Sequence, residues 1–101
     1  MDKLEYFYHR NLFNDEQEQL IFIWEEGITK VNILEVGFKC ENITSKVIKK
    51  ELILSDYPHQ STSLSVTFEN GDSLLFENIN DSNNEYSSEY TEEIKAIYKL
   101  L

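Results

Sequence analysis

The stretch LSVTFENGDSLLF (residues 64–76) determines the part of the fold that the sequence predicts most clearly. Two alternating apolar runs flank Glu69-Asn70-Gly71, a pattern typical of a β-hairpin. With these three residues as the loop, the apolar side chains of both strands share one face: Leu64, Val66, Phe68, Leu74 and Phe76. A two-residue Asn-Gly loop would shift the register and place Leu64 opposite Glu77. The pattern therefore predicts a three-residue loop with Gly71 in the left-handed region.

An earlier segment, FIWEEGITKV (22–31), resembles this hairpin, and it predicts a second three-residue loop ending at Gly27. The residues before it, 14–26, allow two interpretations. Asn14 and Gln17 could cap a helix that Gly27 closes. The run LIFIW (20–24), rich in β-branched and aromatic residues, favours a strand instead. The strand is our interpretation, and the helix remains the alternative.

Three further segments have the composition of strands: LEYFYHR (4–10), ITKVNILEVGFK (28–39) and SKVIKKELILS (45–55). The last contains the only cluster of bases, Lys46, Lys49 and Lys50, which we interpret as the protection of an edge strand against aggregation. Residues 55–61 are expected to form a turn, and residues 78–90 a polar loop.

The C-terminal segment has the pattern of an amphipathic helix. Its apolar residues recur at helical spacing, at Tyr90, Ile94, Ile97, Tyr98 and Leu101. Ser87 or Ser88 can cap the helix, acidic residues open it and lysines lie towards its end, an order that suits the helix dipole. The sequence thus predicts a single α+β domain over residues 1–101. It comprises an antiparallel β-sheet of five or six strands, in hairpins or a meander, with one C-terminal helix packed on one face. The uncovered sheet face must curl, stay polar or meet a partner.

Charge is distributed very unevenly along the chain. Nineteen acids and nine bases give a net charge of −10, yet residues 51–94 contain ten acids and no base. A charge of this size repels nucleic acid and anionic membranes and attracts basic partners. Direct binding to nucleic acid or to a membrane is therefore not expected.

The sequence shows no motif that is typical of catalysis or of cofactor binding. It has no nucleophile elbow, glycine-rich phosphate loop or metalloprotease motif, and it lacks the spacing of an EF-hand. Cys40 is the single cysteine, which excludes an intrachain disulfide, and we expect it to be buried or half-buried as a small hydrophobe. The N-terminus lacks the apolar run of a signal peptide, and LIFIW is too short to cross a bilayer. We expect a non-enzymatic, metal-free, cytoplasmic protein of a bacterial cell or phage-infected host.

The leading hypothesis is a small acidic inhibitor that imitates nucleic acid and blocks a basic protein that handles nucleic acid, such as a nuclease, a restriction enzyme or a CRISPR-type effector. Phage anti-defence proteins work in this way. The expected partner-binding residues are Glu69, Asp72, Glu77, Asp81, Glu85, Glu89, Glu92 and Glu93. The alternatives are an immunity or antitoxin protein that neutralises a basic toxin, and an assembly module that oligomerises, for instance as a homodimer, through the uncovered sheet face.

Overall fold

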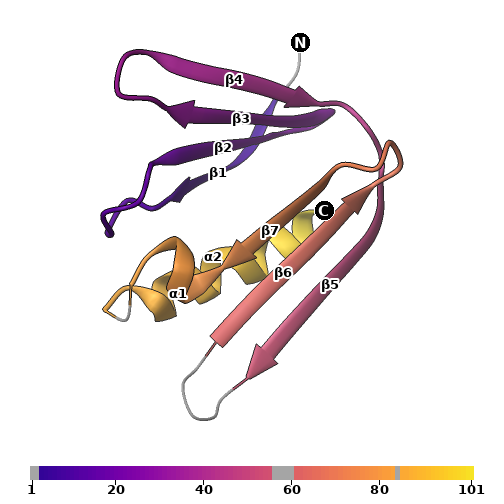
Figure 1. The fold of residues 1–101 in the computed structure, drawn as a ribbon. Coiled ribbons are helices and arrows are strands. Elements are labelled where there is room, and N and C mark those ends of the chain that lie inside the picture. The colour runs from indigo at the N-terminus through magenta and orange to yellow at the C-terminus, as the bar shows by residue number, and fades with distance from the viewer. Residues whose placement is uncertain (1–2, 56–60, 84) are drawn as a thin grey trace.

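A computed structural model describes residues 3–55, 61–83 and 85–101. In this part of the chain, seven antiparallel strands form two sheets and are accompanied by two helices (Figure 1). Sheet A, in spatial order, consists of β1 (Leu4–Arg10), β2 (Gln19–Trp24), β3 (Gly27–Ile33) and β4 (Phe38–Ile43). Sheet B consists of β5 (Val47–Ser55), β6 (Ser61–Phe68) and β7 (Ser73–Glu77). The helices are α1 (Asn78–Asp81) and α2 (Ser87–Leu100).

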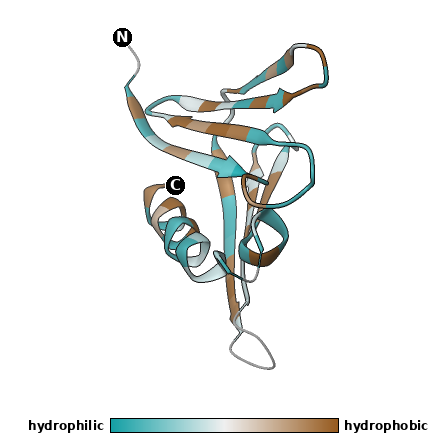
Figure 2. Cartoon of the chain, turned by 90° about the vertical axis from the view of Figure 1, so that its left-hand side faces the viewer, coloured by the Kyte–Doolittle hydropathy of each residue, from teal (hydrophilic) through white to brown (hydrophobic). Residues whose placement is uncertain are grey.

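A single core joins the two sheets and α2. Sheet A contributes Tyr8, Ile21, Ile23, Ile28 and Ile43, and sheet B contributes Leu64, Val66, Phe68, Leu74 and Phe76. From α2 come the three fully enclosed residues of the predicted stripe, Tyr90, Ile94 and Ile97. Along the strands and along α2, hydrophobic and hydrophilic residues alternate, as Figure 2 shows. The predicted α+β class, with antiparallel strands and a C-terminal helix packed on the sheet, is confirmed.

The register of the decisive hairpin is also confirmed. Leu64 pairs with Phe76 and Val66 with Leu74, and the Phe68 N–H donates to the Asp72 carbonyl at 2.9 Å. Gly71 has a φ of 97°, the left-handed conformation that the third loop position requires. The apolar face of this hairpin is buried against α2, and its other face carries mainly serine and threonine.

The first hairpin differs from its prediction. Residues 19–24 do form a strand, but Trp24 pairs with Gly27, so the loop is Glu25-Glu26 and Gly27 belongs to β3. The reason for glycine here is steric rather than conformational. A Cβ on Gly27 would lie 2.8 Å from the carbonyl oxygen of Ile43, on the neighbouring strand. The close approach of β3 and β4 at this point requires a residue without a side chain.

Gly27→Ala is accordingly expected to lower the free energy of unfolding by about 1–3 kcal/mol, the usual cost of overpacking. Chemical denaturation of the variant measures this directly. Ser65→Ala, a change on the half-buried outer face of β6, serves as the control and should stay within about 0.5 kcal/mol of wild type. If Gly27→Ala unfolds at the same denaturant concentration as wild type, β3 and β4 can move apart at this point without loss of stability.

The strand count exceeds the five or six expected because residues 28–39 are not one strand. The chain turns at residues 34–37, where Gly37 has a φ of 91° and the Leu34 N–H donates to the Gly37 carbonyl at 3.0 Å. Two strands, β3 and β4, result. The interpretation of 45–55 as an edge strand is confirmed, since β5 ends sheet B and pairs only with β6. The turn expected at 55–61 falls largely on residues 56–60, outside the described residues.

Residues 78–90 are more ordered than a polar loop. Asn78 in α1 is buried, and its amide oxygen accepts from the Thr62 N–H at 2.9 Å while its nitrogen donates to the Thr91 hydroxyl at 3.0 Å. This asparagine therefore joins α1 to β6 and α2. Helix α2 begins at Ser87, but Tyr86 occupies the N-cap position and no side chain caps it. The predicted serine cap is wrong.

Candidate interaction surfaces

The eight acidic residues predicted to form one binding face occupy different places in the structure. Glu69 and Asp72 are exposed at the tip of the β6–β7 hairpin. Glu77 ends β7, directly before α1, and Glu85, Glu89 and Glu92 are exposed in the following loop and on α2. Because β7 lies between Asp72 and Glu77, the hairpin tip and α1 are at opposite ends of the strand (Figure 1). The carboxylates therefore do not form one continuous face.

Asp81 is not a surface residue, and its predicted place on the binding face is a mistake. It is 6% exposed. Its Oδ2 accepts from the Tyr8 hydroxyl at 2.6 Å and from the Glu77 N–H at 2.9 Å, and its Oδ1 lies 3.1 Å from Arg10 Nε. The sequence around Asp81 is polar, and Arg10, the base that Asp81 contacts, lies 71 positions away. Local composition therefore indicated an exposed acid. Asp81 binds β1 to α1.

The Tyr8 hydroxyl stays a proton donor to this buried carboxylate. Burial, followed by the charge of Asp81, raises the pKa of Tyr8 far above its ordinary value of 10.0. The Tyr8 ring packs edge-on against Phe76 and Tyr90, with centroid separations of 5.0 and 5.4 Å. The Tyr90 hydroxyl in turn donates to the His9 carbonyl, and burial raises the pKa of Tyr90 to about 12. Both tyrosines thus remain neutral links between sheet A and the rest of the molecule.

The structure does gather carboxylates at one end of the molecule, from two segments far apart in the sequence. The β1–β2 connection packs on the loop between the helices, where Asn14 Nδ2 donates to the Ser82 carbonyl at 3.0 Å and Asn83 Nδ2 to the Phe13 carbonyl at 2.8 Å. The Phe13 and Tyr86 rings stack with centroids 3.7 Å apart. Figure 1 shows both loops at the same end. We call this region the acidic end and define it by Asp15, Glu16, Glu85, Glu89 and Glu92, all exposed.

Sequence reasoning missed the contribution of Asp15 and Glu16 to this surface. The only available signal was the polar composition of NDEQEQ, which indicated a connection but not where it packs. The acidic end also displays apolar side chains, since Leu12 is 44% exposed and Phe13 36%. On a basic protein surface, arginine and lysine carry their charged groups at the ends of apolar stems. Carboxylates around a small apolar patch can therefore contact both the charged groups and the stems of such a surface.

Glu93, the last of the predicted binding residues, faces sheet A rather than solvent. It is half-buried and accepts a hydrogen bond from the Tyr6 hydroxyl. Burial raises the pKa of Glu93 above its ordinary value of 4.5, and the Tyr6 hydrogen bond counteracts this only in part. A carboxyl with a raised folded-state pKa favours the folded state when protonated. Its contribution is complete below the unfolded-state pKa and is lost as the pH rises through the folded-state pKa.

Glu93→Gln is therefore expected to raise the free energy of unfolding at pH 7, because it removes a buried charge and keeps an acceptor for Tyr6. At pH 3 the variant and the wild type should be equally stable, since Glu93 of the wild type is then protonated in both the folded and the unfolded state. Denaturant titrations at the two pH values measure this difference. A variant that is less stable than wild type at pH 7 would show that the ionised form is the favoured one.

The outward face of sheet A is rich in aromatic and aliphatic side chains. In the strand register, Phe7 lies opposite Phe22, and their ring centroids are 5.0 Å apart. Trp24 stacks beyond Phe22 at 6.2 Å, and its indole nitrogen donates to the Thr29 hydroxyl at 3.0 Å. Towards the β3–β4 turn the apolar residues become more exposed: Ile33 36%, Leu34 42%, Phe38 66% and Val36 89%. This turn points away from α2 and sheet B (Figure 1).

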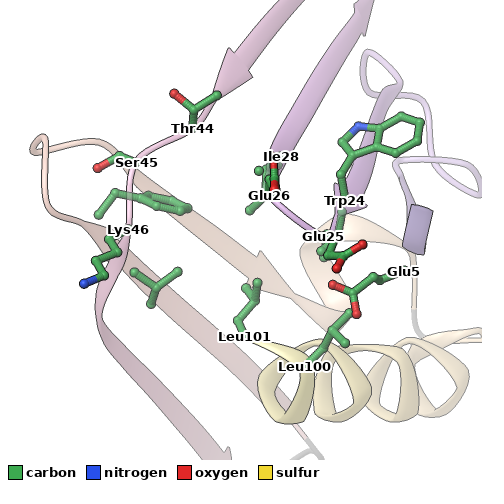
Figure 3. A pocket seen from close by; sticks show the side chains of 14 residues that line it. Glu5, Trp24, Glu25, Glu26, Ile28, Thr44, Ser45, Lys46, Leu100 and Leu101 are labelled. Carbon is green, nitrogen blue, oxygen red and sulfur yellow. The ribbon is translucent and has the colours of Figure 1, made fainter. Parts of the chain in front are cut away.

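A pocket of about 400 Å³ opens where the two sheets diverge, beside the C-terminal end of α2 (Figure 3). Its apolar wall includes Ile23, Ile28 and Phe68, and carboxylates of Glu5, Glu25 and Glu26 line it together with Lys46. Its lining contains no histidine or cysteine. It lies at the far end of α2 from the acidic end.

Residues 3–55, 61–83 and 85–101 are the part of the chain that the structure describes. These residues include no group of three or more histidine, cysteine, aspartate or glutamate side chains placed to hold a metal ion. None of their helices is both long and apolar enough to cross a bilayer. Cys40, expected to be buried or half-buried, is exposed on β4.

The chain was compared with protein families, curated proteins and solved structures. No family model, no curated protein and no solved structure matches it. The assignment of a function therefore depends on the surfaces described above.

Proposed function

We propose that this chain is a small, non-enzymatic inhibitor that binds a basic, nucleic-acid-handling protein through its acidic end. The observation that carries the proposal is the packing of the β1–β2 connection on the loop between α1 and α2. This packing combines the exposed acids Asp15 and Glu16 with Glu85 and Glu89 on one surface.

The electrostatics of this surface support a basic partner. The base that the structure places beside it is Lys95, whose Nζ lies 3.8 Å from Glu92 Oε1 in an exposed pair. Exposed pairs of this kind stabilise little. Arg10, the other base in this part of the fold, is occupied by the buried Asp81 and by the Leu75 carbonyl. Most of the negative charge of the acidic end is thus available to a ligand.

A protein that grips nucleic acid already has arginine and lysine side chains placed to meet phosphates, and carboxylates satisfy the same donors. Carboxylates on a supported loop and a helix are held at fixed positions, which reduces the entropy lost on binding. The hairpin-tip acids Glu69 and Asp72 lie at the other end of β7 from α1 (Figure 1). We therefore propose the acidic end, without them, as the inhibitory surface.

The combined variant Asp15→Lys, Glu16→Lys and Glu85→Lys tests this proposal. All three side chains are exposed, so the fold should keep its thermal stability. Association with a basic partner should slow at least about tenfold at low salt, and its salt dependence should flatten. The control changes Glu69 and Asp72 to lysine, which alters the charge by four units instead of six, and does so at the hairpin tip, so it should leave association nearly unchanged.

The partner can be sought among proteins that a DNA column retains from a cell lysate. Wild-type protein on beads should capture a component of this fraction, and the lysine variant should not. Capture that is equally strong with both proteins, or equally reduced by the hairpin-tip control, would contradict a role of the acidic end.

A further inference from the structure

The open edge of β4 is unlike the other three open edges of the two sheets. The register of β1 is interrupted between Leu4 and Tyr6. The β5 edge carries Lys49 and Lys50, and its register shifts between Val47 and Lys49. On the short β7, the Leu75 carbonyl accepts from Arg10. Bulges, lysines, short length and covering side chains are the usual means of preventing strands from pairing with another chain. In the described part of the chain, the six residues of β4 pair with β3 in an uninterrupted register, and Lys39 is their only lysine.

The β3–β4 hairpin is also electrically neutral, in contrast to the rest of the chain. Residues 27–43 contain Lys30 and Lys39, balanced by Glu35 and Glu41, so the net charge of −10 belongs to the remaining residues. Five of the six β4 residues are exposed, including Phe38, and only Ile43 is buried. Because the β3–β4 hairpin has no net negative charge, it does not attract a basic partner. A second copy of this chain can approach here without like charges being brought together at the contact.

Charge also selects one register for such a contact. Two β4 strands related by a two-fold axis perpendicular to the sheet must be centred on a single residue, because only then do equivalent faces match. Centring on Lys39 places lysine opposite lysine, and centring on Glu41 places glutamate opposite glutamate. Centring on Cys40 places Lys39 of each copy opposite Glu41 of the other. Opposite charges directly across a sheet stabilise the pairing and like charges weaken it.

We propose that this protein forms a two-fold symmetric dimer by antiparallel pairing of β4 with β4 of a second copy, centred on Cys40. The two copies of sheet A become one eight-stranded sheet with the aromatic faces on the same side. The exposed apolar turn at residues 34–37 of each copy then lies beside the end of β4 in the other. The acidic end of each copy is not used, so the dimer does not depend on the proposed function.

The single cysteine makes the register directly testable. Residues directly opposite in an antiparallel pair have Cα atoms about 4.5–5.5 Å apart. A short bismaleimide, which adds one thiol to each of its two rings, should therefore link two wild-type chains through Cys40 efficiently. Moving the thiol to another exposed site, by combining Cys40→Ser with Glu85→Cys, should abolish the rapid linkage. Equal linkage of both proteins would overturn the proposed contact.

Charge exchange tests the register independently of the linker. Lys39→Glu and Glu41→Lys should each weaken dimerisation at least about tenfold in sedimentation experiments, because each replaces attractive pairs by repulsive ones. An equimolar mixture of the two variants should recover dimerisation and linkage, since every pair across the two-fold axis then has opposite charges. Lys39 is exposed, so circular dichroism and thermal stability of Lys39→Glu should match wild type. A mixture that remains monomeric, or a wild-type protein that is monomeric at all concentrations, would refute the dimer.

The dependence on salt concentration distinguishes the proposed dimer from the proposed binding of a basic partner. Two chains with a charge of −10 each repel, so added salt should strengthen dimerisation by screening. Binding of a basic partner should weaken with salt. The Asp15, Glu16 and Glu85 lysine variant should dimerise at least as well as wild type, whether or not it loses a partner. Dimerisation that weakens with salt would contradict the neutral contact proposed here.

Discussion

Replacing Asp81 by alanine is expected to lower the free energy of unfolding by about 3–5 kcal/mol, the cost of breaking a buried ion pair by removing one partner. The change leaves the Tyr8 hydroxyl and the Glu77 N–H without the acceptor they share, and it leaves the Arg10 guanidinium without its carboxylate. Such a loss is a large part of the roughly 5–15 kcal/mol that stabilises an ordinary domain. Urea denaturation followed by circular dichroism measures it.

Glu85→Ala is the matched control, because it removes an acidic residue from the same region but from an exposed position. Its effect should stay within about 0.5 kcal/mol. If the Asp81 variant unfolds at the same denaturant concentration as this control, Asp81 does not hold β1 and α1 together in the way described.

Ile97→Ala should cost about 2–5 kcal/mol, since it deletes buried methyl and methylene groups and leaves a cavity. Ile97 is 0% exposed and belongs to the core that joins α2 to the sheets, as does Ile94, for which the same loss is expected. Unfolding monitored by denaturant gives the value for each variant.

Leu100→Ala on the same helix provides the comparison. Leu100 is 38% exposed, so the same kind of truncation removes less buried surface and should cost clearly less. Equal effects at positions 97 and 100 would indicate that α2 is not packed by its predicted stripe.

Periodicity predicted those elements whose apolar residues all face one core. The stripe of α2 and the register of the β6–β7 hairpin follow directly from local spacing, because a one-residue shift would expose half of the apolar residues. Periodicity failed at residues 28–39, where apolar residues continue through the turn: Leu34 and Val36 are exposed instead of buried. Only Gly37 marked this turn, and a glycine within a strand pattern also fits a bulge.

The candidate site was harder to predict because it depends on contacts between distant segments. Asp81 resembles its acidic neighbours in the sequence, and the Tyr8 and Arg10 partners that bury it are more than 70 positions away. Likewise, Asp15 and Glu16 join Glu85 only because Asn14 and Asn83 each bond the opposite loop. Charge composition indicated a basic partner, but the location of the acidic surface required the tertiary structure.

Competition with nucleic acid tests the central proposal most directly. A protein captured by the acidic end should be released by short duplex DNA, and this chain should in turn displace duplex DNA from that protein. Displacement should require Asp15, Glu16 and Glu85 but not Glu69 and Asp72. A captured protein that holds this chain and duplex DNA at the same time, with neither weakening the other, would contradict the account.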